Sequence, residues 1–404
     1  MGEPAAILVA ARDEEQTIGA TIATLRELFP SAEVIVADDG SRDGTAEEAE
    51  RAGAHVIRLP RLGKGQALTL GESEAPAGTL LLCDADLRGD LRPLLESSAD
   101  LTIAIFNEKQ GGGLGIAKRA GGALIRALSG FEAREPLSGQ RALSVKARRS
   151  CFPLAAGFGC EVRMTIDAAR AGLEISEREL GLSHRATGRD PAGFLHRGRQ
   201  LLDALLACGP LGVNVRGLRL PLVGWTVGLR DEGAVTAIAA LGLADDLWSG
   251  PERGFRAHLG AGRTTGMLKL VGIPLVGLIA TRKLSGALLV GLAANFLNQL
   301  DTRPGRALKA YLIGALVVRA PLGTAVLLLP YDLREQTMLG DAGSNALGAM
   351  LGLSSVSRLT GSSRWLAIGA LAALTALGER RSLGELIERT PVLAALDRLG
   401  RETP

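Results

Sequence analysis

Short apolar runs alternate with amphipathic segments through the first half of the chain. The apolar runs are rich in Val, Ile, Leu and Ala and predict buried strands at Ala5–Ala11, Glu33–Ala37, His55–Leu59 and Thr79–Cys83. The segments between them predict helices near Glu15–Leu28, Asp43–Ala52 and Lys64–Gly71. This βαβ rhythm predicts an α/β domain with a Rossmann-like, mostly parallel sheet.

Beyond Gly209 the apolar stretches are longer, and small charged loops separate them. They cover Leu218–Leu229, Ala234–Leu243, Met267–Ala280, Leu284–Leu297, Leu308–Pro330, Ala346–Val356 and Leu366–Leu377. Because they have almost no polar face, we interpret them as roughly five to seven membrane helices, some short or tilted. The alternative is a set of buried helices in a large soluble domain. Arg319 interrupts one stretch near its middle, which predicts a short hairpin that does not fully cross.

These patterns divide the chain into three parts. Residues 1–209 form the α/β domain, residues 210–380 an all-α polytopic membrane domain, and residues 381–404 an amphipathic C-terminal helix on the membrane surface or against the other domain. Loops rich in Arg and Lys belong on the cytoplasmic side, and the chain opens without a signal-peptide pattern. We therefore expect a multi-pass protein of the cell membrane with a cytoplasmic N-terminal domain.

Composition narrows the choice of partners. The net charge of +3 is small beside 46 basic and 43 acidic residues, and aromatic residues make up only 3% of the chain. Base-stacking surfaces are therefore not expected, and no nucleic-acid partner is predicted. The four cysteines show no metal-binding or redox spacing, which favours reduced, buried thiols. A homo-oligomer stays possible.

Acidic residues follow three of the predicted strands. The first strand leads into Ala-Arg-Asp-Glu-Glu (11–15), the second into Asp38-Asp39-Gly-Ser, and the fourth into Asp84-Ala-Asp86. Ligands of parallel sheets bind at the carboxyl ends of the strands, so these acids face one crevice. A divalent cation bridging a pyrophosphate would relieve their repulsion, and Lys64 is placed to add a positive charge. The second motif could also be an ordinary turn with a helix cap.

In order and spacing, the three motifs resemble those of the family 2 glycosyltransferases of the GT-A fold. The resemblance covers roughly residues 4–205 and implies a nucleotide-sugar donor. It also implies that Ala11, Glu14 and Asp39 contact the nucleoside, while Asp84 and Asp86 lie near the diphosphate. Asp86 would then ligate Mg²⁺ or Mn²⁺ and act in catalysis.

Two later segments extend the resemblance. Glu135-Pro-Leu-Ser-Gly-Gln-Arg141 resembles the acceptor-side segment of these enzymes, and Gly157–Val162 resembles the helix start that follows it, which makes Glu161 a candidate catalytic or acceptor-contacting acid. The alternative is a solvated acid that stabilises a helix N-terminus.

The run Glu179–Arg189 resembles that of the glucosyl-3-phosphoglycerate synthases. By that resemblance His184 completes the metal site, and Arg185 and Arg189 flank the diphosphate. A structural histidine in a solvated basic loop is the plainer alternative.

The second half resembles the polyprenyl-phosphate sugar-1-phosphate transferases. This resemblance rests on three motifs, Gly242–Trp248, Asn295–Asp301 and Met338–Asn345. The resemblance implies a magnesium and phosphate site made by Asp245, Asp246, Asn298, Asp301 and Asp341. This half is shorter than in that family, the middle motif runs into Thr-Arg-Pro-Gly-Arg (302–306), and no histidine follows His258.

Together these features predict a metal-dependent glycosyltransferase. We expect it to move a sugar from a nucleotide sugar to a polyprenyl-phosphate or other membrane-proximal acceptor in cell-envelope glycan synthesis. One alternative is a bifunctional enzyme whose second half transfers a sugar-1-phosphate to polyprenyl phosphate. The other is a membrane scaffold with a degenerate second site.

Overall fold

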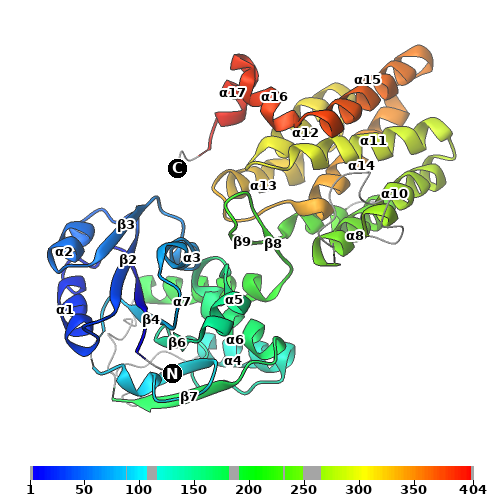
Figure 1. Cartoon of the computed structure of the whole chain (residues 1–404). Helices are drawn as coiled ribbons and strands as arrows, with labels where there is room; N and C mark the ends of the chain where they lie inside the picture. The colour runs from blue at the N-terminus through cyan, green and yellow to red at the C-terminus, as the bar shows by residue number, and fades with distance from the viewer. Residues whose placement is uncertain are drawn as a thin grey trace. The chain divides into compact units, whose positions relative to one another are not determined.

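The structure is a computed structural model that describes residues 3–87, 89–106, 116–181, 191–230, 233–248 and 265–401. The chain divides into two compact units, one made of residues 1–209 with 217–219, the other of 210–216 with 220–403 (Figure 1). Each unit has its own hydrophobic core. The division falls where the sequence changes from mixed charged and apolar residues to long apolar stretches.

Within the described residues, the first unit is built on a seven-stranded sheet with the order β3-β2-β1-β4-β6-β5-β7. Its strands are β1 (Ala6–Ala11), β2 (Glu33–Asp39), β3 (His55–Leu59), β4 (Leu80–Asp84), β5 (Leu101–Phe106), β6 (Arg141–Leu143) and β7 (Ile175–Leu180). Only β6 runs antiparallel to its neighbours, between β4 and β5. The predicted mostly parallel α/β domain is confirmed, with all four predicted strands in place.

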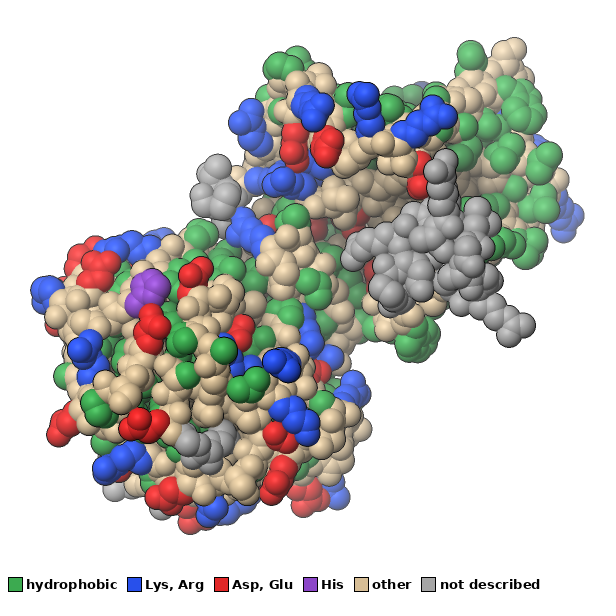
Figure 2. Space-filling view, viewed as in Figure 1, with side chains coloured by type: hydrophobic (Ala, Val, Ile, Leu, Met, Phe, Trp, Pro, Cys, Tyr) green, Lys and Arg blue, Asp and Glu red, His purple; other side chains and the backbone are tan. Residues whose placement is uncertain are grey.

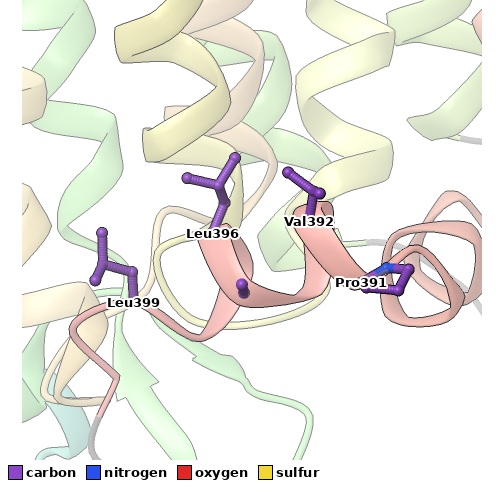
Figure 3. Close-up of a pocket in the computed structure, with 5 residues that line it drawn as sticks. Pro391, Val392, Leu396 and Leu399 are labelled. Carbon is purple, nitrogen blue, oxygen red and sulfur yellow. The ribbon is translucent and has the colours of Figure 1, made fainter.

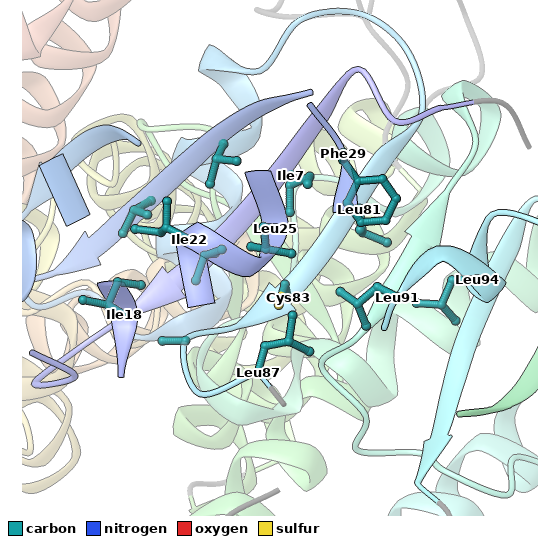
Figure 4. Packing of buried hydrophobic residues seen from close by; sticks show 14 of the residues in the cluster. Ile7, Ile18, Ile22, Leu25, Phe29, Leu81, Cys83, Leu87, Leu91 and Leu94 are labelled. Carbon is teal, nitrogen blue, oxygen red and sulfur yellow. The ribbon is translucent and has the colours of Figure 1, made fainter. Parts of the chain in front are cut away.

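Helices cover both faces of this sheet, and their bounds are α1 (Ile18–Leu28), α2 (Thr45–Arg51), α3 (Lys64–Glu74), α4 (Ile116–Ser129), α5 (Val145–Cys151), α6 (Cys160–Arg170) and α7 (Pro191–Cys208), with 3-10 turns η1 (Arg92–Leu94) and η2 (Gly157–Gly159). In α1, Ile18, Ile22 and Leu25 recur at helical spacing and are fully buried in the same cluster as the strand residues Ile7 and Leu81 (Figure 4). On the other face, α3, α5 and α6 pack into a second cluster. Burial of these apolar stripes fixes the helices to the sheet.

The second unit is all-α apart from the short strands β8 (Leu211–Val213) and β9 (Arg219–Pro221) near its start. Its elements are η3 (Val223–Arg230), α8 (Gly233–Trp248), α10 (Thr265–Thr281), α11 (Leu284–Leu300), α12 (Arg306–Val318), α13 (Gly323–Leu333), α14 (Gly340–Arg358), α15 (Gly361–Arg380), α16 (Leu383–Arg389) and α17 (Pro391–Arg398). Helix α14 lies against α11 at its centre, where a Cβ on Gly348 would meet the Cα of Ala294 at 2.3 Å. Glycine is needed there because the two backbones approach so closely.

Membrane-spanning helices were expected in this unit. Within the described ranges, none of the helices combines the length and the apolarity that crossing a bilayer requires. Helices α10 and α11 have 17 residues each, and α12 and α13 have 13 and 11. The all-α architecture is confirmed, and the polytopic spans are not found among these helices.

The structure also shows the chain around Arg319 and the C-terminal residues 381–401. The interruption predicted at Arg319 is present, because this residue adopts a left-handed conformation (φ 55°) that ends α12 before α13 begins at Gly323. The single amphipathic helix predicted for residues 381–404 is wrong. It is two short helices, α16 and α17, that meet at Thr390, where Pro391 cannot continue the preceding helix.

Candidate active site

The acidic motifs of the first unit meet at one edge of its sheet. Strand β1 lies between β2 and β4, and the register pairs Ala10 with Asp84 and Ala11 with Asp38. Asp39 follows at the end of β2, beside Leu59 of β3. The sequence prediction that these strand ends face one region is therefore in agreement with the pairing of the strands.

Asp39 joins β2 to the loop that precedes α3. Its carboxylate is buried and accepts hydrogen bonds from the backbone N–H of Leu62 (2.5 Å) and of Gly63 (2.9 and 3.0 Å). Burial raises the pKa of Asp39, although the two amides and the nearby guanidinium groups of Arg12 and Arg61 act in the opposite direction. The nucleoside contact expected of Asp39 would use the lone pairs that these amides leave open.

Glu14 and Asp38 have local partners. The Glu14 carboxylate accepts from the Thr17 hydroxyl (2.7 Å) just before α1, while its backbone N–H donates to Thr45 Oγ1 (2.8 Å). Asp38 accepts from the backbone N–H of Ser41 (3.2 Å) and from its hydroxyl. Asp38 therefore shapes the turn, as the plain alternative had it, and Glu14 is tied to the start of α1.

Lys64 connects two acids that are far apart in the sequence. Its Nζ lies 2.6 Å from Asp84 Oδ1 and 2.7 Å from Glu161 Oε1. Burial alone would lower the pKa of Lys64, but the two carboxylates outweigh it and raise the pKa well above its ordinary value. Lys64 therefore holds Asp84, at the end of β4, close to Glu161 in the first turn of α6.

Glu161 is buried at the start of α6 and is not the solvated acid of the plain alternative. Its second oxygen, Oε2, accepts from the Cys160 thiol (3.1 Å). Burial raises the pKa of that thiol well above its ordinary value, so Cys160 stays neutral and donates. Both oxygens of Glu161 therefore have a fixed partner.

Asp86 differs from these acids. It is partly exposed in the turn after β4, and its side chain forms no hydrogen bond or ion pair with any residue that the structure describes. A carboxylate without such partners keeps its full capacity to accept from a ligand. Of the acids at this edge, Asp86 is the one placed to take a cation.

A divalent cation fits this edge if the substrate supplies most of its ligands. Among the described residues, no group of three or more His, Cys, Asp or Glu side chains could hold a metal ion. Mg²⁺ commonly uses one or two carboxylates together with substrate phosphates and water. Asp86 suits that mode, because Lys64 already neutralises Asp84.

The predicted acceptor-side segment, Glu135–Arg141, lies against Asp84. A Cβ on Gly139 would meet both carboxylate oxygens of Asp84 at 2.4 Å, so only glycine lets the backbone approach there. Arg141, the first residue of β6, is completely buried and was given no role from the sequence. A charged residue opening an apolar strand (Arg-Ala-Leu) was the signal that could have drawn attention to it.

Three predicted donor-site residues, His184, Arg185 and Arg189, lie outside the described residues. Their roles as metal ligand and diphosphate contacts stay predictions.

The five residues predicted for the second half come together in the second unit. Asp246 accepts from the backbone N–H of Asp341 and of Ala342 (both 2.9 Å) at the start of α14. Asn298 donates to Asp341 Oδ1 (2.5 Å), and Asp301 interacts with Gly340 and with the same acids. Residues from α8, α14 and the end of α11 therefore build one polar cluster in this unit.

Lys269 of α10 completes this cluster and was missed from the sequence. Its Nζ lies 2.5 Å from Asp245 Oδ2 and also pairs with Asp341 Oδ2. The ammonium group stands where a cation between these two carboxylates would have to lie, and Asp246 is already occupied by backbone amides. The magnesium and phosphate site that the resemblance implies stays a prediction, and it would require Lys269 to move, although the buried Asp245 Oδ1 has no hydrogen-bond partner among the described residues.

A mostly parallel sheet with carboxylates after three neighbouring strands defines the first unit as a nucleotide-binding α/β domain. Comparison with known proteins gives the family. The Glycosyl transferase family 2 model matches residues 6–97. Glucosyl-3-phosphoglycerate synthase from Mycolicibacterium paratuberculosis is 30% identical over 244 residues, which are 52% of this chain and 73% of that protein. The chain belongs to the family 2 glycosyltransferases.

Other relatives match the same half. Glycosyltransferase AglJ from Haloferax volcanii is 31% identical over 182 residues, which cover 42% of this chain and 60% of that protein. The chain thus spans less than two thirds of AglJ. The crystal structure of glucosyl-3-phosphoglycerate synthase from Mycobacterium tuberculosis with Mn²⁺, uridine-diphosphate-glucose and phosphoglyceric acid is 28% identical, with a TM-score of 0.43, and covers 52% of this chain and 83% of that one.

Proposed function

We propose that this glycosyltransferase moves a sugar from a nucleotide sugar to a polyprenyl-phosphate or similar lipid-linked acceptor in cell-envelope glycan synthesis. The observation that carries the proposal is the Asp86 carboxylate, which has no partner among the described residues and lies two residues after the Lys64-paired Asp84 at the carboxyl edge of the sheet. Such an edge binds the diphosphate of a nucleotide ligand.

The residues of this chain divide the work of donor cleavage. A divalent cation bound at Asp86 would stabilise the negative charge of the departing diphosphate. Lys64 is a partly buried cation paired with Asp84 at the same edge and would add to that stabilisation. By the resemblance, Asp39 and Glu14 would contact the nucleoside. Glu161, which pairs with Lys64, would act on the acceptor.

The acceptor is inferred from the second unit and from the relatives. Glucosyl-3-phosphoglycerate synthase, by its name, glycosylates an acceptor that carries a phosphate. The second unit exposes large apolar side chains, among them Val317 (77%), Leu366 (73%) and Ile279 (68%). Figure 2 displays hydrophobic side chains gathered on the right-hand side of this unit. Extended apolar surface is typical of contact with a membrane, where a lipid-linked acceptor would be found.

The C-terminal helix α17 adds to this apolar surface. Pro391, Val392, Ala395, Leu396 and Leu399 line a shallow apolar groove, and Val392 and Leu396 project from the same side of the helix (Figure 3). We propose that the second unit associates with the cell membrane and that the first unit works at its cytoplasmic face.

The test is transfer of labelled sugar from a panel of nucleotide sugars, UDP-glucose and GDP-mannose included, to polyprenyl phosphate in the presence of Mg²⁺ or Mn²⁺. Asp86→Asn should reduce transfer about 100-fold or more, since a charge needed in the transition state is lost. Asp90→Asn is the matched control, because Asp90 lies in the same loop and only pairs with exposed Arg92. Equal transfer by wild type and Asp86→Asn would refute the proposal.

A second candidate rests on the cluster of Asp245, Asp246 and Asp341. If the second unit transfers a sugar-1-phosphate to polyprenyl phosphate, a UDP-sugar should release UMP, and Asp341→Asn should abolish that release. The Lys269 pairing disfavours this candidate. A scaffold role predicts no UMP release in the wild type and unchanged sugar transfer in Asp341→Asn.

A further inference from the structure

Among the residues that the structure describes, Arg141 is the largest of the fully buried side chains, with no exposed surface. Its Nε donates to the Ser138 carbonyl (2.7 Å), its Nη2 to the Pro136 carbonyl (3.3 Å), and its Nη1 to Thr165 Oγ1 (2.9 Å). None of these partners is charged, and no carboxylate among the described residues forms an ion pair with it. The carboxylates of Glu161 and Glu177 act on the guanidinium only through space. A buried guanidinium without a directly paired carboxylate is costly, so a role beyond packing is indicated.

The first two hydrogen bonds fix the acceptor-side segment. Both accepting carbonyls belong to the turn that leads into β6, and the planar guanidinium can hold two such groups at once. The same turn carries Gly139, whose backbone lies against the carboxylate of Asp84. Movement of this turn would therefore alter the position of the strand-end acid of β4.

The third hydrogen bond leads to the helix that carries Glu161. Thr165 accepts from Arg141 and donates to the Glu161 carbonyl (3.0 Å) one turn earlier in α6. Glu161 pairs with Lys64, and Lys64 pairs with Asp84. These contacts form a closed ring with two links. Arg141 connects the turn at Gly139 to α6, and Lys64 connects Asp84 to Glu161.

We propose that Arg141 is a positioning residue: it sets the placement of Asp84 and Glu161 relative to each other by holding the 136–140 turn and α6 in one frame. Its role in turnover rests on the proposed function. Arg141 does not touch the substrates, and its effect passes through Gly139 and Thr165. Burial lowers the pKa of Arg141, but an arginine stays protonated in proteins, so the five donors remain available.

The first experiment weakens the ring while keeping Arg141. Thr165→Val removes the side-chain oxygen that accepts from Nη1 and is nearly the same size. The matched control is Thr102→Val, because Thr102 is equally buried and its hydroxyl has no hydrogen-bond partner among the described residues. We expect Thr165→Val to lower kcat about tenfold with little change in the KM of the donor, and Thr102→Val to leave both unchanged.

Arg141→Lys is the second variant, since it keeps the charge but cannot hold two carbonyls and Thr165 together. It should lower kcat more than Thr165→Val, by about 100-fold. Equal kcat for wild type and either variant, or a loss that matches only the fraction of unfolded protein, would overturn the proposal.

Amide hydrogen exchange tests the positioning role of Arg141 independently of the proposed glycosyltransferase function. Peptides covering 136–140 should exchange faster in Thr165→Val than in Thr102→Val, whether or not the protein turns over a donor. If the wild type transfers no sugar from any donor while the exchange differs as expected, the proposed function is wrong and the frame around Arg141 stands. Unchanged exchange in Thr165→Val overturns the frame even in an active enzyme.

Discussion

Each unit of this protein places a partly buried lysine between two carboxylates. In the first unit Lys64 pairs with Asp84 and Glu161, and in the second Lys269 pairs with Asp245 and Asp341. In both units the residues come from separate elements, so each cluster ties the fold together. The two clusters nevertheless differ in what they leave open.

The difference lies in the neighbouring acid. In the first unit Asp86 has no partner among the described residues. In the second unit both carboxylate oxygens of Asp246 accept hydrogen bonds from backbone amides at the start of α14. Hydrogen bonds of this kind hold Asp246 at the start of α14, whereas a carboxylate without such partners can also bind a cation. In the second cluster only Asp245 Oδ1 is buried without a hydrogen-bond partner among the described residues, and Lys269 pairs with the other oxygen of that carboxylate. Similar residue types therefore serve a site in one unit and a structural joint in the other.

Lys64→Met should have the largest effect. It leaves Asp84 and Glu161 facing each other without a cation, and breaking a buried pair costs about 3–5 kcal/mol of unfolding free energy. Denaturant unfolding of the first unit measures this loss, and sugar transfer should fall with it. Lys118→Met is the control, since its pair with Glu135 is more exposed and worth only about 0–1 kcal/mol. Similar losses in the two variants would contradict the prediction.

Lys269→Met should destabilise the second unit by about 3 kcal/mol for the same reason. The freed carboxylates of Asp245 and Asp341 should then accept a divalent cation, so Mg²⁺ should raise the melting temperature of the variant and not that of the wild type. Lys283→Met, at an exposed position before α11, provides the control. If Mg²⁺ stabilises the wild type as strongly, the second cluster is a cation site and the contrast between the units fails.

Gly139→Ala should reduce transfer about tenfold, because its Cβ would displace the Asp84 carboxylate from its place beside Lys64. Gly122→Ala in α4 is the control, since its Cβ would have no neighbour closer than 3.6 Å. Kinetics of both variants with one donor measure the difference. Unimpaired transfer by Gly139→Ala would mean that the turn at Gly139 does not restrain Asp84.

The smallest expected effect concerns the pH dependence of stability. Because the pKa of Asp39 is raised in the folded state, the folded protein keeps a proton that the unfolded chain has already lost. From the ordinary value near 3.8 up to the raised pKa, the free energy of unfolding should therefore fall with rising pH.

In Asp39→Asn this contribution is absent, so the wild type should lose stability relative to the variant by at most about 1.4 kcal/mol per pH unit in that window. Urea unfolding of both proteins between acidic and neutral pH measures the difference. A difference that is constant with pH would show that Asp39 ionises normally.

The sequence alone predicted much of the first unit. Strand bounds such as His55–Leu59 follow from local apolar runs, and the acids after β1, β2 and β4 follow from the rule that parallel strands end at one edge. The second unit was predicted less well. Apolar stretches do not distinguish helices buried against each other from helices that cross a bilayer, and the close approach at Gly348 depends on its neighbour α11.

What the chain determined by itself is the order of elements and the chemical types at the strand ends, because both are encoded in residues close together along the sequence. The tertiary structure decided which carboxylates are bonded to other groups of the protein and which has no partner among the described residues. Lys64, Gly139, Arg141 and Glu161 meet only because β6 inserts antiparallel beside β4 and brings α6 with it. Hydrogen bonds and charges act over a few ångströms, so their partners are known only when the folded chain has brought them within reach.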